Sequence, residues 1–293
     1  MTSTPVYPVR ASNVNVSESG RAKNAADEKA ILGEGILSII EPPGSPPGSP
    51  LEPRHRYPLA MWVFPLVAAL VALAFAVLLI RQFASRRRPY QLLWSVALSM
   101  YAVASLAVAA GALNGWSRFG FEVYWLLGAV LNVPFLAAGE LQLLIRNRTA
   151  ELIIDVLLVF LIAYAIAVIR GAVYDAHALT RQLPSGKLVF GDGTAAHRLP
   201  QLISIPSYLI LVAGALWSAW RMRGRPELKD RFVGTLWIAL GATVIAGLGS
   251  AFAALGKLPL FSISLLAGIA MMFWGFLRAS RDATRAPVPQ PSP

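Results

Sequence analysis

Residues 59–88 read LAMWVFPLVAALVALAFAVLLIRQFASRRR, an unbroken apolar run that ends in a cluster of arginines. A helix needs about 20 mostly apolar residues to cross a hydrocarbon core about 30 Å thick, and residues 59–80 supply that length without a charge. The backbone groups of a lipid-embedded segment must be satisfied within the segment, which favours a helix. This stretch therefore predicts an integral membrane protein.

Six further stretches have the same apolar character, and none has the alternating period of a barrel strand. They lie at 91–113, 121–145, 150–170, 201–220, 232–254 and 258–278. The sequence thus predicts an all-α membrane protein with seven transmembrane helices. The membrane domain is expected over 58–280, with an external loop at 171–200. The polar, Pro-, Gly- and Ser-rich stretch 1–57 and the segment 281–293 are expected to be disordered tails.

Composition agrees with this class. Of the 293 residues, 56% are hydrophobic and only 14% are charged, which is too little charge to cover a soluble surface. No cysteine is present, so disulfides and thiol chemistry are excluded. A net charge of +11 would point to nucleic acid in a soluble protein, but a membrane protein carries such an excess in its cytoplasmic loops. We therefore expect no nucleic-acid partner, and anionic lipids beside the basic loops.

Lysine and arginine are unevenly divided between the two sides of the membrane. One side holds fourteen: Arg81, Arg86, Arg87, Arg88, Arg146, Arg148, Arg221, Arg223, Arg225, Lys229, Arg231, Arg278, Arg281 and Arg285. The other holds eight: Arg54, Arg56, Arg118, Arg170, Arg181, Lys187, Arg198 and Lys257. The positive-inside rule places the fourteen in the cytoplasm. The sequence predicts an N-terminus outside and a C-terminus in the cytoplasm.

The first three and last three helices resemble each other. Pro65 matches Pro206, Trp94 matches Trp237, and WLLGAVL (125–131) matches SLLAGIA (264–270) at similar offsets. The two triplets would point the same way through the membrane, with the fourth helix as the linker. This arrangement is a 3+1+3 parallel repeat, and in sugar transporters with such repeats the solute site lies between the halves.

Four residues within the predicted helices are candidates for an intramembrane polar site. Asn132 and Pro134 lie at the middle of the third helix, where the proline frees the Val130 carbonyl. They favour either a ligand groove or an interhelical hydrogen bond. Glu140 and Asp155 lie about six residues inside the ends of the third and fourth helices.

A buried carboxylate needs a cation, a proton or water. By depth, the expected ion-pair partners of Glu140 are Arg278 or Arg81, and the alternative is a carboxyl pair with Asp155.

Two local patterns give further expectations. Ala242, Ala246, Ser250 and Ala254, with nearby glycines, predict a packing seam on the sixth helix. In the external loop, LPSGKLVFGDG (183–193) predicts a small β-hairpin.

No catalytic or cofactor motif is found. The last helix lacks the lysine that holds retinal in opsins, and no predicted helix contains a histidine. The acidic residues and histidines of the external loop have no metal-ligand spacing. We therefore expect a protein that is not an enzyme and has no cofactor or metal.

The stretches RRRPYQLLW (86–94) and GAVLNVPFLAAGE (128–140) resemble a family of seven-helix membrane proteins of actinobacteria and their relatives. The resemblance covers most of 59–280 and implies a seven-helix fold and a bacterial source, without an activity. With the seven spans, it implies a multi-pass protein of the bacterial inner membrane. Two hypotheses for function follow from the sequence. One is a small-solute carrier or channel with its site between the triplets, and the other is a non-catalytic membrane module for ligand sensing or partner binding.

Overall fold

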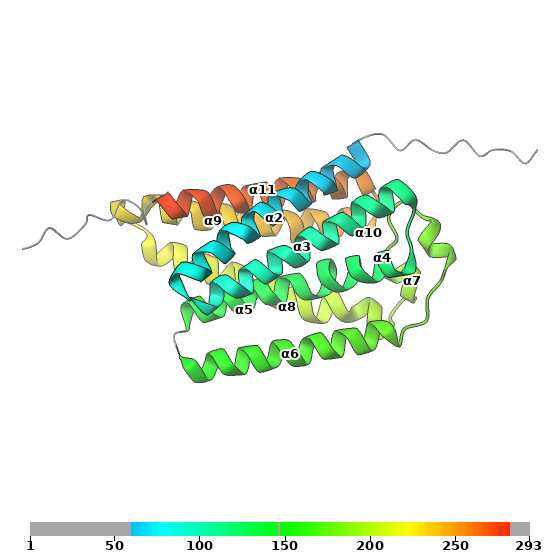
Figure 1. Ribbon diagram of the computed structural model, residues 1–293, viewed down its shortest axis with the longest axis horizontal. Coiled ribbons are helices and arrows are strands. Elements are labelled where there is room, and N and C mark those ends of the chain that lie inside the picture. The colour runs from blue at the N-terminus through cyan, green and yellow to red at the C-terminus, as the bar shows by residue number, and fades with distance from the viewer. Residues whose placement is uncertain (1–59, 146, 282–293) are drawn as a thin grey trace, which may run out of the picture. The chain divides into compact units, whose positions relative to one another are not determined.

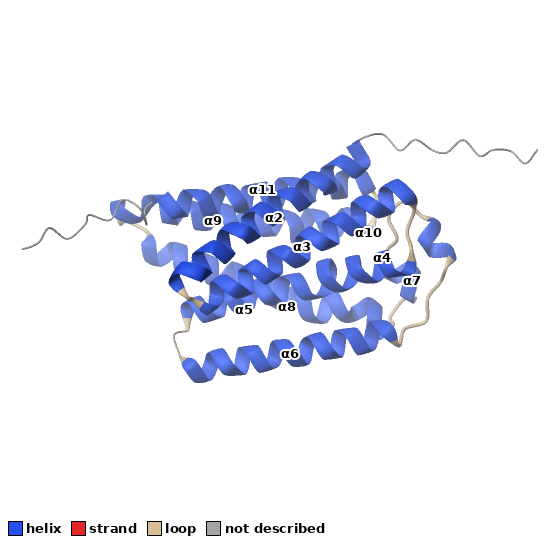
Figure 2. Cartoon of the chain, in the orientation of Figure 1, coloured by secondary structure: helices blue, strands red, loops and turns tan. Residues whose placement is uncertain are grey.

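The computed structural model describes residues 60–145 and 147–281. The predicted tails lie outside the described residues, apart from the helical Arg281. In these ranges, seven helical segments are long and apolar enough to cross a membrane (Figure 2), which confirms an all-α membrane protein with seven spans.

The spans follow one another in a simple up-and-down order. They are α2 (Ala60–Arg86), α3 (Pro89–Asn114), a third span of α4 (Arg118–Val123), η1 (Tyr124–Leu131) and α5 (Asn132–Leu144), α6 (Arg148–Arg170), α8 (Ala195–Met222), a sixth span of α9 (Lys229–Thr243), η4 (Val244–Gly249) and α10 (Ser250–Ala254), and α11 (Leu258–Arg281). The short η3 (Pro226–Leu228) leads into the sixth span. Both η1 and η4 are π-helical, so the third and sixth spans each carry a widened turn near their middle.

Contacts between helices join six of the seven spans into a closed ring, and α6 lies apart from them at the lower edge of Figure 1. Contacts run from α2 to α3, from α3 to α5, from α5 to α8, from α8 to α9, from α9 to α11 and from α11 back to α2. The fourth span, α6, lies outside the ring against α5, η1 and α8. Its most apolar window is 17% buried, the lowest share among the seven spans, whereas the shares within the ring run from 22% for α8 to 56% for α3. The ring is therefore the structural core, and α6 is a peripheral helix.

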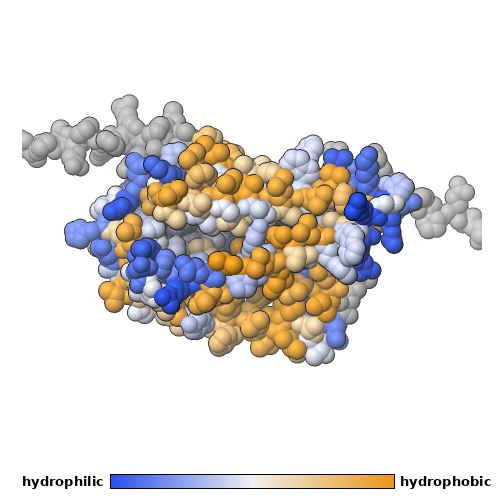
Figure 3. Space-filling view, turned by 180° about the vertical axis from the view of Figure 1, so that it is seen from behind, coloured by the Kyte–Doolittle hydropathy of each residue, from blue (hydrophilic) through white to orange (hydrophobic). Residues whose placement is uncertain are grey.

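The surface of the bundle carries a broad apolar band with polar residues gathered at both ends (Figure 3). Exposed leucine, isoleucine, valine and phenylalanine side chains make up much of this band, as lipid contact requires. We call the end that carries Arg86, Arg148 and Arg221 the arginine-rich end. We call the opposite end, which carries residues 171–200, the loop end.

Glycines bring α9 and α11 into backbone contact. A Cβ on Gly241 would lie 2.5 Å from the Gly268 carbonyl oxygen. Gly234 faces Gly275 in the same way, and each of these two glycines lies seven residues from the first pair on its own helix. Such close approach is typical of helix interfaces in membranes. The predicted seam was partly wrong, because Ser250 and Ala254 are exposed and the glycines carry the contact.

The external loop contains two short helices, η2 (His177–Thr180) and α7 (Gly186–Phe190). The β-hairpin predicted for 183–193 was wrong. The Ser185 carbonyl accepts hydrogen bonds from the amides of Leu188 and Val189, which closes a helical turn, and Gly191 ends it at a φ of 88°. The apolar run is buried as one face of that turn, and its Val189 is only 1% exposed.

Candidate functional site

A cavity of about 90 Å³ lies within the ring of six helices. Every helix of the ring contributes to its lining, whereas no residue of α6 does. One lining residue from each helix, in chain order, is Phe75, Trp94, Glu140, Ser218, Thr235 and Phe276. The cavity is thus located between the first three spans and the last three.

Glu140 is the only ionisable side chain in the lining of this cavity. It is 5% exposed and projects from α5 towards α8. Gly214 makes room for it, since a Cβ on Gly214 would lie 2.6 Å from Glu140 Cγ and 3.0 Å from Oε1. One turn along α8, the Ser218 hydroxyl faces the carboxyl group. The site therefore combines one carboxyl with one close hydroxyl in apolar surroundings.

The ion pair expected between Glu140 and Arg278 or Arg81 does not form. Arg278 Nε instead donates to Asp230 Oδ1 on α9 at 3.1 Å, and Arg81 is exposed. Across the residues that the structure describes, no lysine or arginine lies within 4.0 Å of the Glu140 carboxylate. Glu140 is therefore a buried acid without a counter-ion among residues 60–145 and 147–281.

The alternative carboxyl pair is also absent. Asp155 is exposed on α6, where its Oδ1 accepts a hydrogen bond of 2.8 Å from Gln142 Nε2. Gln142 lies two residues from Glu140 on α5 and so points to a different face of that helix. Asp155 therefore belongs to the contact between α5 and α6 and lies outside the cavity.

Trp94 is fixed beside Glu140 by two contacts with α5. Its indole Nε1 donates to the Leu136 carbonyl at 3.0 Å. Its ring lies over Gly139, at a position where no Cβ would fit. This contact holds one aromatic wall of the cavity in place.

Asn132 and Pro134 do not line a groove. Asn132 Nδ2 donates to the Ala97 carbonyl on α3 at 3.0 Å, and both residues are buried. The Val130 carbonyl that the proline frees accepts a hydrogen bond of 3.2 Å from the Ser204 hydroxyl of α8. Asn132 thus makes the interhelical hydrogen bond that was the structural alternative to a groove.

A packed layer separates the cavity from the loop end. Tyr101, a turn beyond the lining residue Leu98, donates its hydroxyl to the Leu265 carbonyl of α11 at 2.9 Å. Asn132 joins α5 to α3 within the same layer. In this conformation the cavity lies in the half of the bundle nearer the arginine-rich end.

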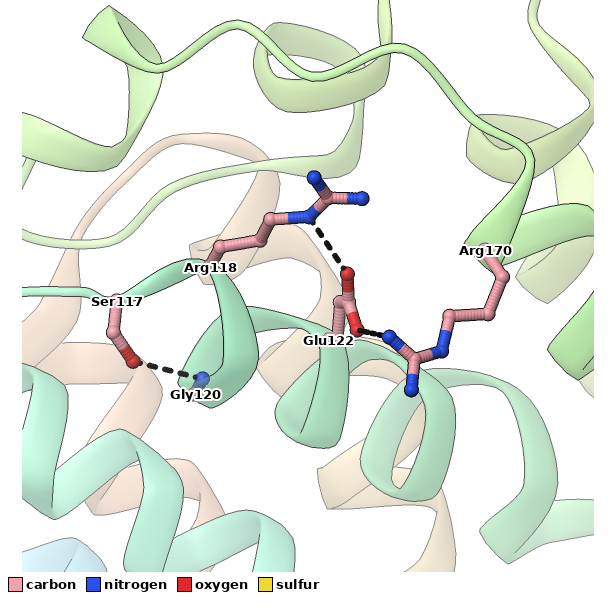
Figure 4. A network of polar contacts seen from close by, with 5 residues as sticks. All are labelled: Ser117, Arg118, Gly120, Glu122 and Arg170. Atoms are coloured by element: carbon pink, nitrogen blue, oxygen red, sulfur yellow. Dashed lines mark hydrogen bonds and ion pairs between the residues drawn. The ribbon is translucent and has the colours of Figure 1, made fainter.

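A second buried acid, Glu122, lies at the loop end of the third span and is fully paired (Figure 4). Arg118 Nε lies 3.0 Å from Glu122 Oε1, and Arg170 Nη1 of α6 lies 3.6 Å from Oε2. The Arg118 guanidinium also lies 4.3 Å from the centre of the Tyr174 ring. The cluster ties the third span, α6 and the external loop together.

The external loop caps the loop end through aromatic side chains. Trp116 Nε1 donates to the Gln182 carbonyl at 2.9 Å, and Trp125 Nε1 donates to the Ala196 carbonyl at 3.1 Å. Phe190 packs against Trp125 and Tyr174. Sequence analysis missed this cap, although tryptophans near helix ends are a signal of the membrane interface.

Two pKa values in the loop are shifted. Partial burial raises the pKa of the Tyr174 phenol above its usual range. The Lys187 ammonium, 2.8 Å from Asp192, holds the pKa of that exposed carboxyl below its usual range. Both shifts follow from local packing and pairing.

A wider depression of about 630 Å³ opens at the loop end between the α3–α4 turn and η2. Its lining includes Asn114, Ser117 and Thr180 but no ionisable side chain. No group of three or more potential metal ligands occurs among the described residues. The cavity around Glu140 is therefore the candidate site with the most distinctive chemistry.

Comparisons of the chain with protein-family models, with curated proteins and with solved structures found no match.

Proposed function

We propose that this chain is a small-solute carrier and that the cavity around Glu140 is its solute site. The observation that carries the proposal is the buried carboxyl of Glu140, which has no counter-ion among the described residues and lies in a mostly apolar cavity. Ionisable groups inside a membrane are costly, and those that are kept usually serve transport or proton transfer. The proposed role is not enzymatic.

The arrangement of the ring supports a site between two repeated halves. In a ring built from two parallel repeats, the two triplets meet along two seams. Here α5 meets α8 at one seam, and α11 meets α2 at the other. The matched tryptophans each contact a glycine in the third helix of their own triplet. Trp94 places its indole ring over Gly139, and Trp237 approaches Gly275 with its Cβ. Parallel-repeat carriers move solute by rocking such halves around a central site.

Transport would require the packed layer to open. Within the layer, Tyr101 bonds to α11 and Asn132 bonds to α3. The Tyr101 bond joins the two triplets, as does the nearby bond from Ser204 of α8 to the Val130 carbonyl, so rocking would disturb both and leave the Asn132 bond intact. A cavity that the packed layer separates from the loop end fits an occluded or inward-facing state of a carrier better than an open channel.

We also propose in which membrane the protein lies and which end of the bundle faces the cytoplasm. We place the arginine-rich end in the cytoplasm of a bacterial cell, with the N-terminus outside, because of the excess of arginine and lysine at that end. Arg86, Arg221 and Arg225 are exposed there and are suited to contact with anionic lipid headgroups.

The alternative function is a membrane module that senses a ligand or binds a partner. The packed layer and the aromatic cap favour it, because a rigid bundle needs no opening towards the loop end. The two functions differ in one testable respect. A carrier exposes its cavity to both sides of the membrane in turn, whereas a static module does not.

Cysteine accessibility separates the two, because the chain contains no cysteine of its own. With Ser218→Cys in the cavity, a membrane-impermeant thiol reagent should react when it is applied from either side. Reaction from one side only, or none, would contradict the carrier and favour the module.

The controls come from three positions outside the cavity. Ser262 is 0% exposed, so Ser262→Cys should stay unreactive in the folded protein. Ser85→Cys at the arginine-rich end and Thr180→Cys at the loop end should each react from one side. Labelling of Ser85→Cys from the outside would reverse the proposed orientation.

A further inference from the structure

The size of the cavity limits its occupant. An engineered protein cavity of about 150 Å³ binds benzene, which has six non-hydrogen atoms. By simple proportion, 90 Å³ admits a solute of roughly three or four non-hydrogen atoms. Sugars, amino acids and nucleotides are too large for the cavity in this conformation.

The charge of the site limits the occupant further. Glu140 has no counter-ion among the described residues, and Arg278 of α11, which was an expected partner, is paired with Asp230 of α9. Arg81 on α2 and Arg221 on α8 are exposed at the arginine-rich end. A solute with one positive charge would supply the missing counter-ion, whereas an anion would be repelled and a neutral solute would leave the carboxylate uncompensated.

The oxygen atoms of the site are too few for a metal ion. Apart from Glu140, the polar side chains in the lining are the Ser218 and Thr235 hydroxyls and the Trp94 indole. Thr235 uses its hydrogen to bond the Arg231 carbonyl at 2.9 Å, and the indole is a donor only. Hard cations such as Ca²⁺ require six to eight oxygen ligands.

An alkylammonium ion matches the remaining surfaces. Its NH₃⁺ group has three donors, which the Glu140 carboxylate and the Ser218 hydroxyl can accept. Its alkyl carbons would contact the leucine side chains of the lining, and the rings of Phe75, Trp94 and Phe276 favour a nearby cation.

We infer that the cavity binds a small primary alkylammonium ion, of the size of methylammonium to propylammonium, with its ammonium group at Glu140. This inference rests on the proposed function for its place in transport, but binding can be measured separately.

The test uses the full chain purified in lipid nanodiscs, with ethylammonium as the probe and ethanol as a neutral probe of the same size. Saturation-transfer NMR should detect ethylammonium and give no signal for ethanol. Glu140→Gln keeps the size of the side chain and removes its charge, so it should weaken ethylammonium binding at least tenfold. Asp155→Asn removes a carboxyl of similar depth outside the cavity and should leave binding unchanged.

A second variant covers a folding failure of Glu140→Gln. Ala215→Leu would fill the cavity and keep the carboxyl, and it should also abolish binding. Equal signals from ethanol and ethylammonium, or full binding by Glu140→Gln, would overturn the inference.

The two proposals fail in different ways. Ethylammonium binding with one-sided labelling of Ser218→Cys would support the ligand and contradict the carrier. Two-sided labelling without ethylammonium binding would support a carrier and contradict this ligand.

Discussion

Two acids on the same transmembrane span have opposite surroundings. Glu122 and Glu140 are both buried, at 8% and 5% exposure. Glu122 is held between Arg118 and Arg170, whereas Glu140 faces a cavity and has no cation within 4.0 Å among the described residues. The difference shows that burial alone does not mark a functional acid. The paired acid fastens helices, and the acid without a counter-ion is the one that we propose as a ligand site.

The largest expected effect on stability comes from replacing Glu122 by its amide, and the same change at Glu140 is the comparison. Glu122→Gln would remove a charge that two arginines share, and breaking a buried ion pair costs about 3–5 kcal/mol. Because 58% of the Arg118 side chain and 71% of that of Arg170 are exposed, we expect about 1–2 kcal/mol here. Glu140→Gln should not lower stability, because no ion pair is lost and an amide is less costly to bury than a charge.

Thermal unfolding of the two variants in the same detergent measures this contrast. A loss of about 1–2 kcal/mol corresponds to a fall in Tm of several degrees for a protein of this size. A larger fall for Glu140→Gln than for Glu122→Gln would mean that Glu140 has a structural partner, and the comparison would fail.

The sequence predicted the fold well and the site only in part. Seven apolar runs set the spans, because spanning length and hydropathy are local properties. The depth of Glu140 also followed from counting residues. The predicted ion pair was wrong, because helical periodicity gives the depth of a side chain but not which helix it faces. Arg278, one of the two expected partners of Glu140, instead pairs with Asp230 of α9.

The cavity itself could not be read from the sequence. It depends on Gly214 and Ser218 of α8, which are more than 70 residues from Glu140 along the chain. The loop segment 183–193 shows that a local pattern can also fit two different structures. Its turn formers and apolar run fit both a hairpin and a short helix, and packing of Val189 and Phe190 at the loop end chose the helix.

A smaller effect should follow from crowding Glu140 without changing its charge. Gly214→Ala would place a Cβ 2.6 Å from Glu140 Cγ, so the carboxyl must shift away from Ser218. We expect ethylammonium binding to weaken roughly tenfold, or about 1.4 kcal/mol, with little change in stability, because alanine is about 1 kcal/mol better than glycine in a helix.

The matched control for this change is Gly247→Ala, whose Cβ would meet no atom within 4 Å. It should keep binding and leave stability unchanged or slightly higher. Normal ethylammonium binding by Gly214→Ala, measured in the same NMR titration, would show that the position of the carboxyl beside Ser218 is unimportant.

The smallest effect is expected from the exposed pair of Lys187 and Asp192, which extends the comparison to an acid in water. The Asp192 side chain is 68% exposed, although its carboxyl lies 2.8 Å from the lysine. Exposed pairs contribute little because solvent and salt screen them. The folded pKa of Asp192 is lowered by Lys187, so its contribution is present above the unfolded pKa and is lost as the pH falls through the folded pKa. Asp192→Asn should therefore leave Tm at pH 7 almost unchanged and only flatten the acid limb of a Tm-against-pH curve. A fall in Tm at pH 7 as large as that of Glu122→Gln would show that the loop pair fastens the cap as firmly as the buried cluster does.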